Sequence, residues 1–458
     1  MSAGATLAGW ASRLTLADVP PDVQAQACAH LVDGLGTAVA AATTGAAAPA
    51  VDVATGLGGP PEATIIGTAH RGSAFAAAMA NGTLVHALDF DDTHAAGLVH
   101  ATAIVLPVAF AVGEERGSSG TEVLAAAIAG YELVCRLAAA APQSFHARGA
   151  HPTSVCGAVA AALVAGKLSG LSQQQMEDAI GIAVSQASGV MEFLHTGGST
   201  KQFHAGWAAG SGIIAARLAA AGLAGPRAGL EGEFGLYRVF ADRTPDLAVL
   251  TDDLGGAWQL DEITIKPYPS CQLMHASLDA AKDLRATVGD IAGLRDVVAA
   301  VPSTAAFIVC EPRVQKVKPS SPYDAKFSLP WSVAAMLVDG VVGLSTYATD
   351  QLDRPELTAL AARITHEIVP YHGPDAEAPG RLRARTHDGR HIEALVARSS
   401  GSPGNPLGAD GLRDKLRGNL GSESAADSMI AAVNDLASAP DVGSVMRLVS
   451  THSGVRRG

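Results

Sequence analysis

The sequence predicts a mainly α-helical protein with a smaller α+β part. Hydrophobic residues make up 48% of the 458 residues but aromatic residues only 4%. Ala, Val, Leu and Ile must therefore fill most of the core, which suits closely packed helices. Helical periodicity dominates to about residue 223, and short β-branched segments appear after about residue 260. A chain of this length is expected to form two or three domains.

The predicted helices of the first half start at recognisable signals. Pro20 and Pro21 open a helix that runs towards Thr43, and Ser73 precedes another that reaches about His86. Further segments with helical apolar spacing are residues 99–112, 121–139, 152–168, 172–185 and 204–221. Together these segments predict a helical bundle.

The next part of the chain has a different pattern. Strand-like segments are DEITIKPYPS, RDVVAAVPSTAAFIVCEP, ARITHEIVPY and GRLRARTHDGRHIEALVA. Asp388-Gly389 indicates a hairpin, and helical patterns at 275–286 and 329–338 lie among the strands, which favours an α+β domain. Helices resume near residue 405. We therefore expect an all-helical domain from residues 1–262 and 405–458, and an inserted α+β domain from 263–404.

Composition argues against several classes of protein. A net charge of −12 argues against a nucleic-acid-binding surface. Five scattered cysteines without a CxxC pair indicate neither a zinc site nor a disulfide framework, and fit the cytoplasm. The N-terminal segment lacks a signal-peptide pattern and the Ala-rich runs are interrupted, so we expect neither export nor membrane insertion. The Gly-x-Gly in GLGTAVAAATTG follows a helical pattern, which disfavours dinucleotide binding.

Ionisable residues are concentrated in NGTLVHALDFDDTHAAGLVHAT. This segment contains Asp89, Asp91, Asp92, Thr93, His94 and His100. Such a density of carboxylates suggests a divalent-metal site, or a device that tunes the pKa of a nearby histidine. The alternative is a solvated, Asp-rich helix end, which the helix dipole disfavours.

Two further segments place basic residues at helix starts. His151 directly precedes Pro152, and an imidazole at a helix N-terminus has a lowered pKa, which suits a general base. The alternative is a helix cap. A Gly-Gly-Ser-Thr loop delivers Lys201 and His204 to the start of the next helix, where the lysine could bind a carboxylate. The alternative is a solvated surface lysine.

The α+β part contributes a turn and a helix start. Lys266 ends a predicted strand, and a proline-rich turn with Cys271 leads to a helix near His275. The turn is either a structural crossover or part of a ligand pocket at a domain junction. Tyr323 and Lys326 precede another buried-looking helix.

Taken in order along the chain, six segments resemble the MmgE/PrpD family, which includes 2-methylcitrate dehydratase, cis-aconitate decarboxylase and iminodisuccinate epimerase. They are HALDFDDTH, HPTSVCGAVAAALVAGKL, STKQFHAGWAAGSGIIAA, IKPYPSCQLMHASLDA, AKFSLPWSVAAMLVDG and GNPLGADGLRDKL. The resemblance covers nearly the whole chain. It implies an all-helical domain formed from both chain ends, an inserted α+β lid domain, an active site in the cleft between them, a homodimer, and catalysis without a metal or organic cofactor.

The resemblance also implies the site residues. The expected catalytic residues are Asp89, His100, His151, Lys201, Lys266 and Tyr323. The expected substrate-binding residues are Thr93, Cys271, Gln272, His275 and His204. The lysines would bind carboxylates and the histidines would exchange protons with a small di- or tricarboxylate.

Two departures from the decarboxylase-like members bear on the reaction. Cys271 stands where those enzymes carry a histidine, and Gln272 stands where many family members carry arginine, which removes a positive charge. Both departures weaken a specific expectation of cis-aconitate decarboxylation. Because dehydration is the commonest expectation for the family, we expect a hydro-lyase similar to 2-methylcitrate dehydratase, with a cis-aconitate-type decarboxylase or an iminodisuccinate-type epimerase as alternatives. A terpene synthase is disfavoured by the few aromatic residues. A non-catalytic carboxylate-binding protein is the remaining alternative.

Overall fold

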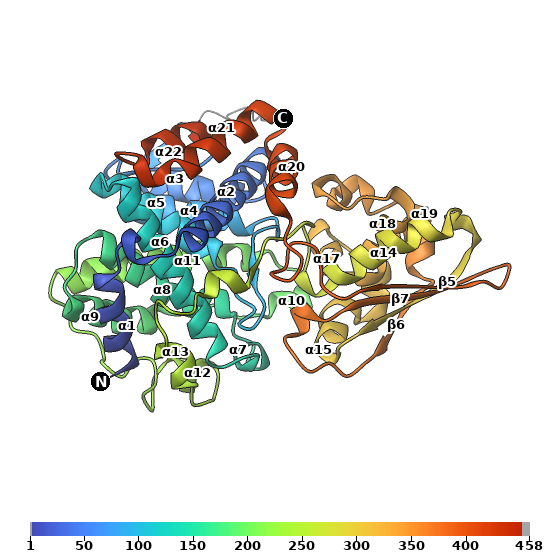
Figure 1. Ribbon diagram of the computed structural model, residues 1–458, viewed down its shortest axis with the longest axis horizontal. Coiled ribbons are helices and arrows are strands. Elements are labelled where there is room, and N and C mark those ends of the chain that lie inside the picture. Colours follow the sequence, from blue (N-terminus) through green and yellow to red (C-terminus); the bar gives the residue numbers. More distant parts are fainter. Residues whose placement is uncertain (1, 451–458) are drawn as a thin grey trace. The chain divides into compact units, whose positions relative to one another are not determined.

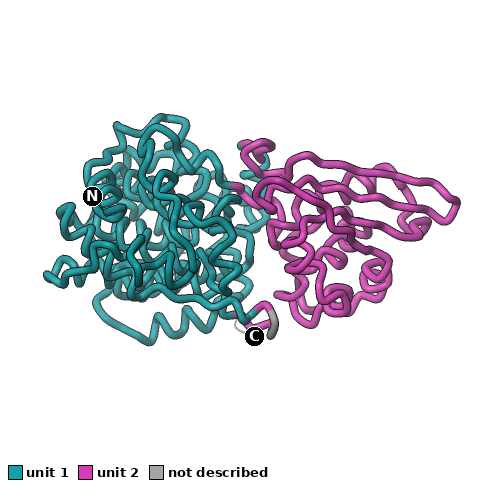
Figure 2. The backbone as a smooth tube through the Cα atoms, turned by 90° about the horizontal axis from the view of Figure 1, so that it is seen from below, with its two compact units in different colours: residues 1–193, 200–263, 409–458 teal, residues 194–199, 264–408 magenta. Residues whose placement is uncertain are grey.

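The computed structural model describes residues 2–450 and divides into two compact units. Unit 1 combines residues 2–193, 200–263 and 409–450, and unit 2 combines residues 194–199 and 264–408 (Figure 2). Unit 1 is almost entirely helical, whereas unit 2 contains a four-stranded sheet with helices. The predicted mainly helical fold with an α+β part is therefore confirmed.

Unit 1 is a layered bundle of helices. Its first segments contain α1 (Ala3–Arg13), α2 (Pro21–Thr44), α3 (Ala48–Leu57), α4 (Ala74–His86), α5 (Thr102–Arg116), α6 (Gly120–Ala139), α7 (Ser144–Ala147), α8 (Pro152–Leu168), α9 (Gln173–Gln186), α11 (Thr200–Ala220), α12 (Leu236–Phe240) and α13 (Leu247–Thr251). The chain re-enters the unit at α20 (Gly408–Leu420), α21 (Glu423–Asn434) and α22 (Gly443–Ser450). α21 packs against α2, so segments from both ends of the chain share one body (Figure 1).

Small residues allow the central helices to approach closely. α11 packs against both α4 and α8. A Cβ atom on Gly206 of α11 would overlap the carbonyl oxygen of Met79 and the hydroxyl of Thr83, and one on Gly212 would overlap Ala161 of α8. These contacts explain why a core with few aromatic residues is well packed, since backbone meets backbone where side chains are missing.

Local capping fixes where the helices begin. Ser73 accepts a hydrogen bond from the Ala76 amide at the start of α4, and α8 begins at Pro152, where the missing amide hydrogen costs nothing. The helix expected from residue 99 begins instead at Thr102. The reason is that Val99 pairs with His94 in an isolated β-bridge, so residues 99–101 precede the helix.

Unit 2 is built around a sheet with the strand order β6-β5-β7-β8. Its strands are β5 (Leu294–Val301), β6 (Ile364–Ile368), β7 (Gly380–Thr386) and β8 (His391–Val396). β5 runs parallel to β6 and antiparallel to β7, and β7 and β8 form the hairpin that Asp388-Gly389 predicts. Its longer helices are α14 (His275–Val288), α18 (Leu329–Asp339) and α19 (Pro355–Ala361). α14 packs on β7 and β8.

Two of the expected strands are shorter than their β-branched sequences suggest. β4 (Ile263–Thr264) has only two residues, because the prolines that follow cannot continue a ladder. The segment after β5 turns helical from Ser303, since Pro302 ends the strand. The other short elements are β1 (Ala63–Thr64), β2 (Arg71–Gly72), β3 (Thr93–His94), α10 (Phe193–Thr196), α15 (Ser303–Ala305), α16 (Arg313–Val317) and α17 (Pro322–Ala325).

The length and composition of the helices decide whether one of them could cross a membrane. Within residues 2–450, no single helix is both long enough and apolar enough to cross a membrane. The bent pair of α2 and α3, which meet at 95°, reaches that length and composition only when the two are taken together.

Candidate active site

The acidic loop between α4 and α5 is buried in unit 1. Asp89, Asp91 and Asp92 are 1%, 0% and 0% exposed, so the interpretation as a solvated helix end is wrong. Asp89 adopts a left-handed backbone with φ of 51°, a conformation that aspartate tolerates better than most residues. Each carboxylate has a partner of its own within the unit. The loop is therefore an internal element whose charges must be compensated inside the protein.

Asp92 ties the loop to the start of α5. Its carboxylate accepts hydrogen bonds from the Thr102 amide at 3.0 Å and the Thr102 hydroxyl at 2.5 Å, and pairs with His30 Nδ1 at 2.9 Å. Burial opposes ionisation, but the bonds from His30 and Thr102 outweigh it and lower the pKa of Asp92. Asp92 thus remains an anion that caps α5 and holds the loop.

A lysine from the C-terminal segment holds the same loop from another side. Lys415 Nζ in α20 donates to the carbonyl oxygen of Phe90 at 2.8 Å and pairs with Asp33 Oδ1 of α2 at 2.6 Å. The ammonium also lies 3.9 Å from the centre of the Phe90 ring, a cation–π arrangement. The return of the chain into unit 1 therefore supports the acidic loop directly.

His100 follows the loop, and its tautomer is set by a backbone carbonyl. His100 Nδ1 lies 2.9 Å from the carbonyl oxygen of Asp92, which can only accept a hydrogen bond. Nδ1 must therefore carry the proton, which leaves Nε2 as the nitrogen that gains and loses one. Thr93 Oγ1 lies 3.4 Å from the same Nδ1, and the His100 amide donates to Thr153 Oγ1 in the first turn of α8.

A second buried histidine stands beside His100. His86, at the end of α4, pairs through Nδ1 with Asp91 Oδ2 at 2.8 Å, and the same oxygen lies 3.4 Å from His100 Nδ1. The rings of His86 and His100 are 4.6 Å apart between centres, and those of His86 and His151 are 5.7 Å apart and nearly parallel. His86 thus contacts both histidines that the sequence singled out, whose own ring centres are 6.3 Å apart.

Lys201 lies in the first turn of α11 and pairs with the acidic loop. Its Nζ is 3.0 Å from Asp89 Oδ1, and the residue is only 7% exposed. The interpretation as a solvated surface lysine is therefore wrong. Gln202 adds a second link, since its side-chain amide donates to the carbonyl of Ala87 at 3.2 Å. α11 is thereby joined to the end of α4, and a cation is placed among the histidines and carboxylates.

His151 and His204 form a pair on the other side of the cluster. His151 is the N-cap of α8, and its Nδ1 lies 3.1 Å from Nδ1 of His204, so one nitrogen donates and the other accepts. Burial, then the Lys201 charge and the neighbouring histidines, hold the pKa of His151 well below 6.5. Burial with His86 and Lys201 lowers the pKa of His204 to about 4. Desolvation rather than the helix dipole is therefore the main cause of the low pKa expected for His151.

The arrangement can perform proton transfer on an anionic ligand, because it combines a cation with histidines of different character. The Asp92 carbonyl fixes the proton of His100 on Nδ1 and leaves Nε2 to exchange one, whereas His151 and His204 are held neutral. The cluster also contains two groups of possible metal ligands. Within each group, the ligand atoms all lie within 4.8 Å of one another, close enough to bind one metal ion. These groups are His86 with His100 and His151, and Asp89 with Asp91 and His100.

The structure gathers six of the expected site residues in unit 1: Asp89, Thr93, His100, His151, Lys201 and His204. It also adds His86 and Lys415, which the sequence did not single out, and Asp91, which was noted in the acidic segment but not expected among the catalytic or substrate-binding residues. The signal for His86 and Asp91 was present in HALDFDDTH, where their spacing places the histidine at the end of a helix and the carboxylate in the next loop. Lys415 gave no local signal, since its partners lie hundreds of residues away.

The other expected residues lie in unit 2, around the turn that precedes α14. Lys266 is fully buried at 0% exposure. The Cys271 amide donates to the carbonyl of Lys326 at 3.0 Å, and Gln272 Nε2 donates to Ser399 Oγ at 3.3 Å. His275 Nε2 lies 3.1 Å from the carbonyl oxygen of Ser270. This turn is therefore a firmly held buried structure.

Tyr323 lies in the short helix α17 of unit 2, half-buried, with its ring 5.3 Å from that of Phe327. Because Lys326 ends this helix and its carbonyl accepts the Cys271 amide, the two expected segments of unit 2 are neighbours in space. The sequence spacing of more than fifty residues gave no indication of this.

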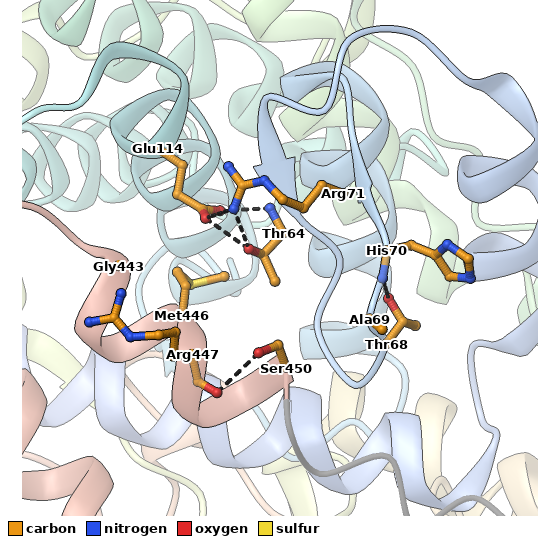
Figure 3. A pocket seen from close by; sticks show the side chains of 10 residues that line it. All are labelled: Thr64, Thr68, Ala69, His70, Arg71, Glu114, Gly443, Met446, Arg447 and Ser450. Atoms are coloured by element: carbon orange, nitrogen blue, oxygen red, sulfur yellow. Dashed lines mark hydrogen bonds and ion pairs between the residues drawn. The ribbon is translucent and has the colours of Figure 1, made fainter.

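A pocket of about 500 Å³ lies elsewhere in unit 1, between α22, the end of α5 and the β1–β2 hairpin (Figure 3). Arg71 lies at its edge and pairs with Glu114 at 2.6 Å, so these two charges compensate each other. The lining residues are Thr64, Thr68, Ala69, His70, Arg71, Glu114, Gly443, Met446, Arg447 and Ser450. None of the expected site residues is among them, and we assign the pocket no role in the reaction.

Comparison with known proteins shows the family of the chain. The model of the MmgE/PrpD N-terminal domain matches residues 5–247, and that of the MmgE/PrpD C-terminal domain matches residues 268–437. The chain belongs to the MmgE/PrpD family. The family resemblance expected from the six sequence segments is therefore confirmed.

Individual family members match over most of their length. Cis-aconitate decarboxylase of Aspergillus terreus is 31% identical over 449 residues, which cover 93% of this chain and 91% of that protein. Cis-aconitate decarboxylase of Homo sapiens is 31% identical, with 75% and 72% covered, and that of Mus musculus is 29% identical, with 81% and 78% covered. These matches support an enzyme of the lyase type that acts on carboxylates. They favour the decarboxylase alternative over the expected hydro-lyase.

Proposed function

We propose that this protein is a lyase that removes carbon dioxide from a small unsaturated tricarboxylate of the cis-aconitate type. The observation that carries the proposal is the match to cis-aconitate decarboxylases along more than nine-tenths of the chain. The buried cluster of Asp89, His100, His151, Lys201 and His204 supplies groups suited to this chemistry. Among the alternatives, decarboxylation takes precedence over the dehydration we expected from the sequence.

The proposed reaction requires one proton and no change of redox state. The bond between the departing carboxylate carbon and its neighbour breaks, and carbon dioxide leaves. The electron pair spreads over the adjacent double bond and carboxylate, and a carbon atom then takes up a proton. His100 is the proposed donor, since the Asp92 carbonyl holds its Nδ1 hydrogen and leaves Nε2 to exchange a proton with the substrate.

Charge stabilisation is assigned to Lys201. An ammonium group has three donors, so Nζ can keep its bond to Asp89 while it binds a substrate carboxylate. In a buried site this interaction is stronger than in water, and it offsets the negative charge that develops as the bond breaks. The neutral pair of His151 and His204 adds one further hydrogen-bond donor, the Nε2–H of the histidine whose Nδ1 accepts, without a further charge. Lys266 and Tyr323 are proposed to take part through the family resemblance alone.

Dehydration is the second candidate, because Gln272 replaces the arginine of many family members and Cys271 replaces a histidine of the decarboxylase-like ones. A dehydratase would use the same carbanion chemistry, with an acid at a leaving hydroxyl. The two reactions differ in their products, which makes them simple to separate.

The test is proton NMR of the protein in deuterated water with cis-aconitate, 2-methylcitrate, citrate and iminodisuccinate. We expect the signals of cis-aconitate to be replaced by those of a product that has lost one carboxylate and gained one deuteron. Loss of water from 2-methylcitrate or citrate, with cis-aconitate unchanged, would contradict the proposal and support the hydro-lyase. Deuterium exchange in iminodisuccinate alone would support the epimerase.

A further inference from the structure

Among the buried ionisable groups of unit 1, His86 and Asp91 lack a role in the chemistry described so far. Asp91 Oδ2 contacts two histidines, His86 at 2.8 Å and His100 at 3.4 Å, both through Nδ1. The two rings meet edge to face with centres 4.6 Å apart. A single carboxylate oxygen therefore links His86 to the histidine proposed as proton donor.

The burial of Asp91 and His86 carries a free-energy cost that a purely structural role does not explain. Asp91 Oδ1 and His86 Nε2 are buried and have no hydrogen-bond partner among the described residues. Buried polar atoms are nearly always satisfied, so unsatisfied ones call for a functional explanation. By contrast, the neighbouring Asp92 uses both carboxylate oxygens in hydrogen bonds that hold the loop. Asp91 and His86 thus place a buried carboxylate with an unsatisfied oxygen beside His100, the proposed proton donor.

We propose that Asp91 and His86 form a positioning pair that acts together with the Asp92 carbonyl to keep the proton of His100 on Nδ1 and so directs Nε2 to the substrate. His86 donates to Asp91 and holds its carboxylate in place, and the Asp91 charge, 3.4 Å from His100 Nδ1, favours an N–H over a lone pair on that nitrogen beside the hydrogen bond to the Asp92 carbonyl. The His86 ring also stacks on that of His151 at an interplanar angle of 20°, so it contacts both histidines. This proposal deepens the proposed function, on which its kinetic part rests.

The experiment uses the full chain labelled with ¹⁵N-histidine, with the His100 signals assigned by their loss in His100→Gln. Wild type is expected to show hydrogen on Nδ1 of His100. Asp91→Asn retains the volume but presents an amide, and is expected to raise the fraction with hydrogen on Nε2. It should lower kcat at least about tenfold with KM within about twofold, because a disoriented catalytic histidine affects the chemical step.

Glu132→Gln is the matched control, because Glu132 is an equally buried carboxylate paired with Arg136 in α6. It is expected to lower thermal stability while the His100 signals and kcat stay unchanged. If Asp91→Asn does not fold, His86→Gln decides, since it should shift the same His100 signals.

A neutral His100 in wild type that carries its hydrogen on Nε2 and none on Nδ1, or unchanged His100 signals in the folded variant, would overturn the proposal. The spectra are recorded without substrate. A wild-type protein inactive on every carboxylate would therefore refute the proposed function and still leave the positioning pair tested.

Discussion

Lys201 and Asp89 illustrate how burial changes the meaning of single residues in this protein. On a surface such a pair contributes little, but removing one partner of a buried pair leaves an uncompensated charge. The same reasoning applies to His151, which is neutral because it is desolvated and lies near a cation. At the scale of residues, the site is a set of mutually dependent charges.

Lys201→Met is expected to lower kcat/KM at least about 100-fold, or about 2.7 kcal/mol of transition-state stabilisation, because the carboxylate-binding cation is lost. Lys201→Arg should recover part of the activity. The control is Lys167→Met, because Lys167 is a partly buried lysine at the end of α8 that donates only to the Ala11 and Leu14 carbonyls among the described contacts. It should lower the unfolding midpoint and leave steady-state kinetics unchanged. Equal kinetic losses in both variants would contradict the role of Lys201.

Metal removal tests the expectation that catalysis needs no cofactor. The nitrogen atoms of His86, His100 and His151 lie close enough together to bind a divalent ion, so this site needs the test. After dialysis against EDTA we expect activity within about twofold of the untreated protein, since proton transfer and charge stabilisation are assigned to side chains. Activity that disappears and returns with one added divalent cation would show that the cluster binds a metal.

At the scale of elements, the site depends on how closely three helices approach. α4 ends at His86, α8 begins after His151, and α11 carries Lys201 and His204. Gly82 of α4 and Gly206 of α11 meet so closely that a Cβ on Gly82 would lie 3.0 Å from Gly206 Cα. The helix spacing therefore sets the distances between the histidines.

Gly206→Ala is expected to destabilise the protein by about 1–3 kcal/mol, because the added methyl group overlaps backbone of α4. It should also reduce kcat, since the shift separates His204 and Lys201 from their partners. The matched control is Gly418→Ala in α20, where no atom lies within 4 Å of the new Cβ. That change should be neutral or stabilise by up to about 1 kcal/mol. Chemical denaturation of both variants measures the difference, and equal effects would contradict the packing argument.

Much of the element pattern was predictable because its signals are local. The helix at 152–168 was bounded by Pro152 and by apolar spacing, and the hairpin by Asp388-Gly389. Helix 99–112 was placed too early, because the pairing of Val99 with His94 is a contact that periodicity cannot reveal. The burial of the acidic loop depends on partners in α2 and α20, such as His30 and Lys415, and these too are invisible in a local pattern.

At the scale of the whole molecule, buried neutral histidines couple stability to pH. Burial lowers the pKa of His94 and of His204 to about 4, and that of His151 well below 6.5. In the unfolded chain these groups bind protons near pH 6.5, whereas the folded protein does not until much lower pH. Above pH 6.5 these histidines are neutral in both states and do not change the free energy of unfolding. As the pH falls from 6.5 towards 4, only the unfolded chain gains their protons, so the free energy of unfolding falls.

We expect the free energy of unfolding to fall as the pH is lowered from 7 to 5, by up to about 1.4 kcal/mol per pH unit for each such histidine. Urea denaturation at both pH values measures the slope. His94→Gln, which removes one of these groups outside the proposed reaction, should make the slope shallower. A slope unchanged by this substitution, or stability that rises on acidification, would contradict the assignment.

The whole-molecule predictions from the sequence had different outcomes. The family and the mainly helical fold were recognisable because ordered motifs span the chain. The domain boundaries at 262/263 and 404/405, the homodimer and the cytoplasmic location stay predictions. The preference for a dehydratase rested on the reaction most commonly expected for the family, and that expectation weighs less than similarity to decarboxylases along the full chain. Residue type could not separate these reactions, because they share carbanion chemistry.

The most direct test of the account measures carbon dioxide released from cis-aconitate by wild type and by His100→Gln, with folding verified by circular dichroism. We predict release by wild type and a loss of at least about 100-fold in the folded variant, because the proton donor is removed. Release unaffected by this substitution would contradict the assignment of proton transfer to His100, and no release by wild type would contradict decarboxylation itself.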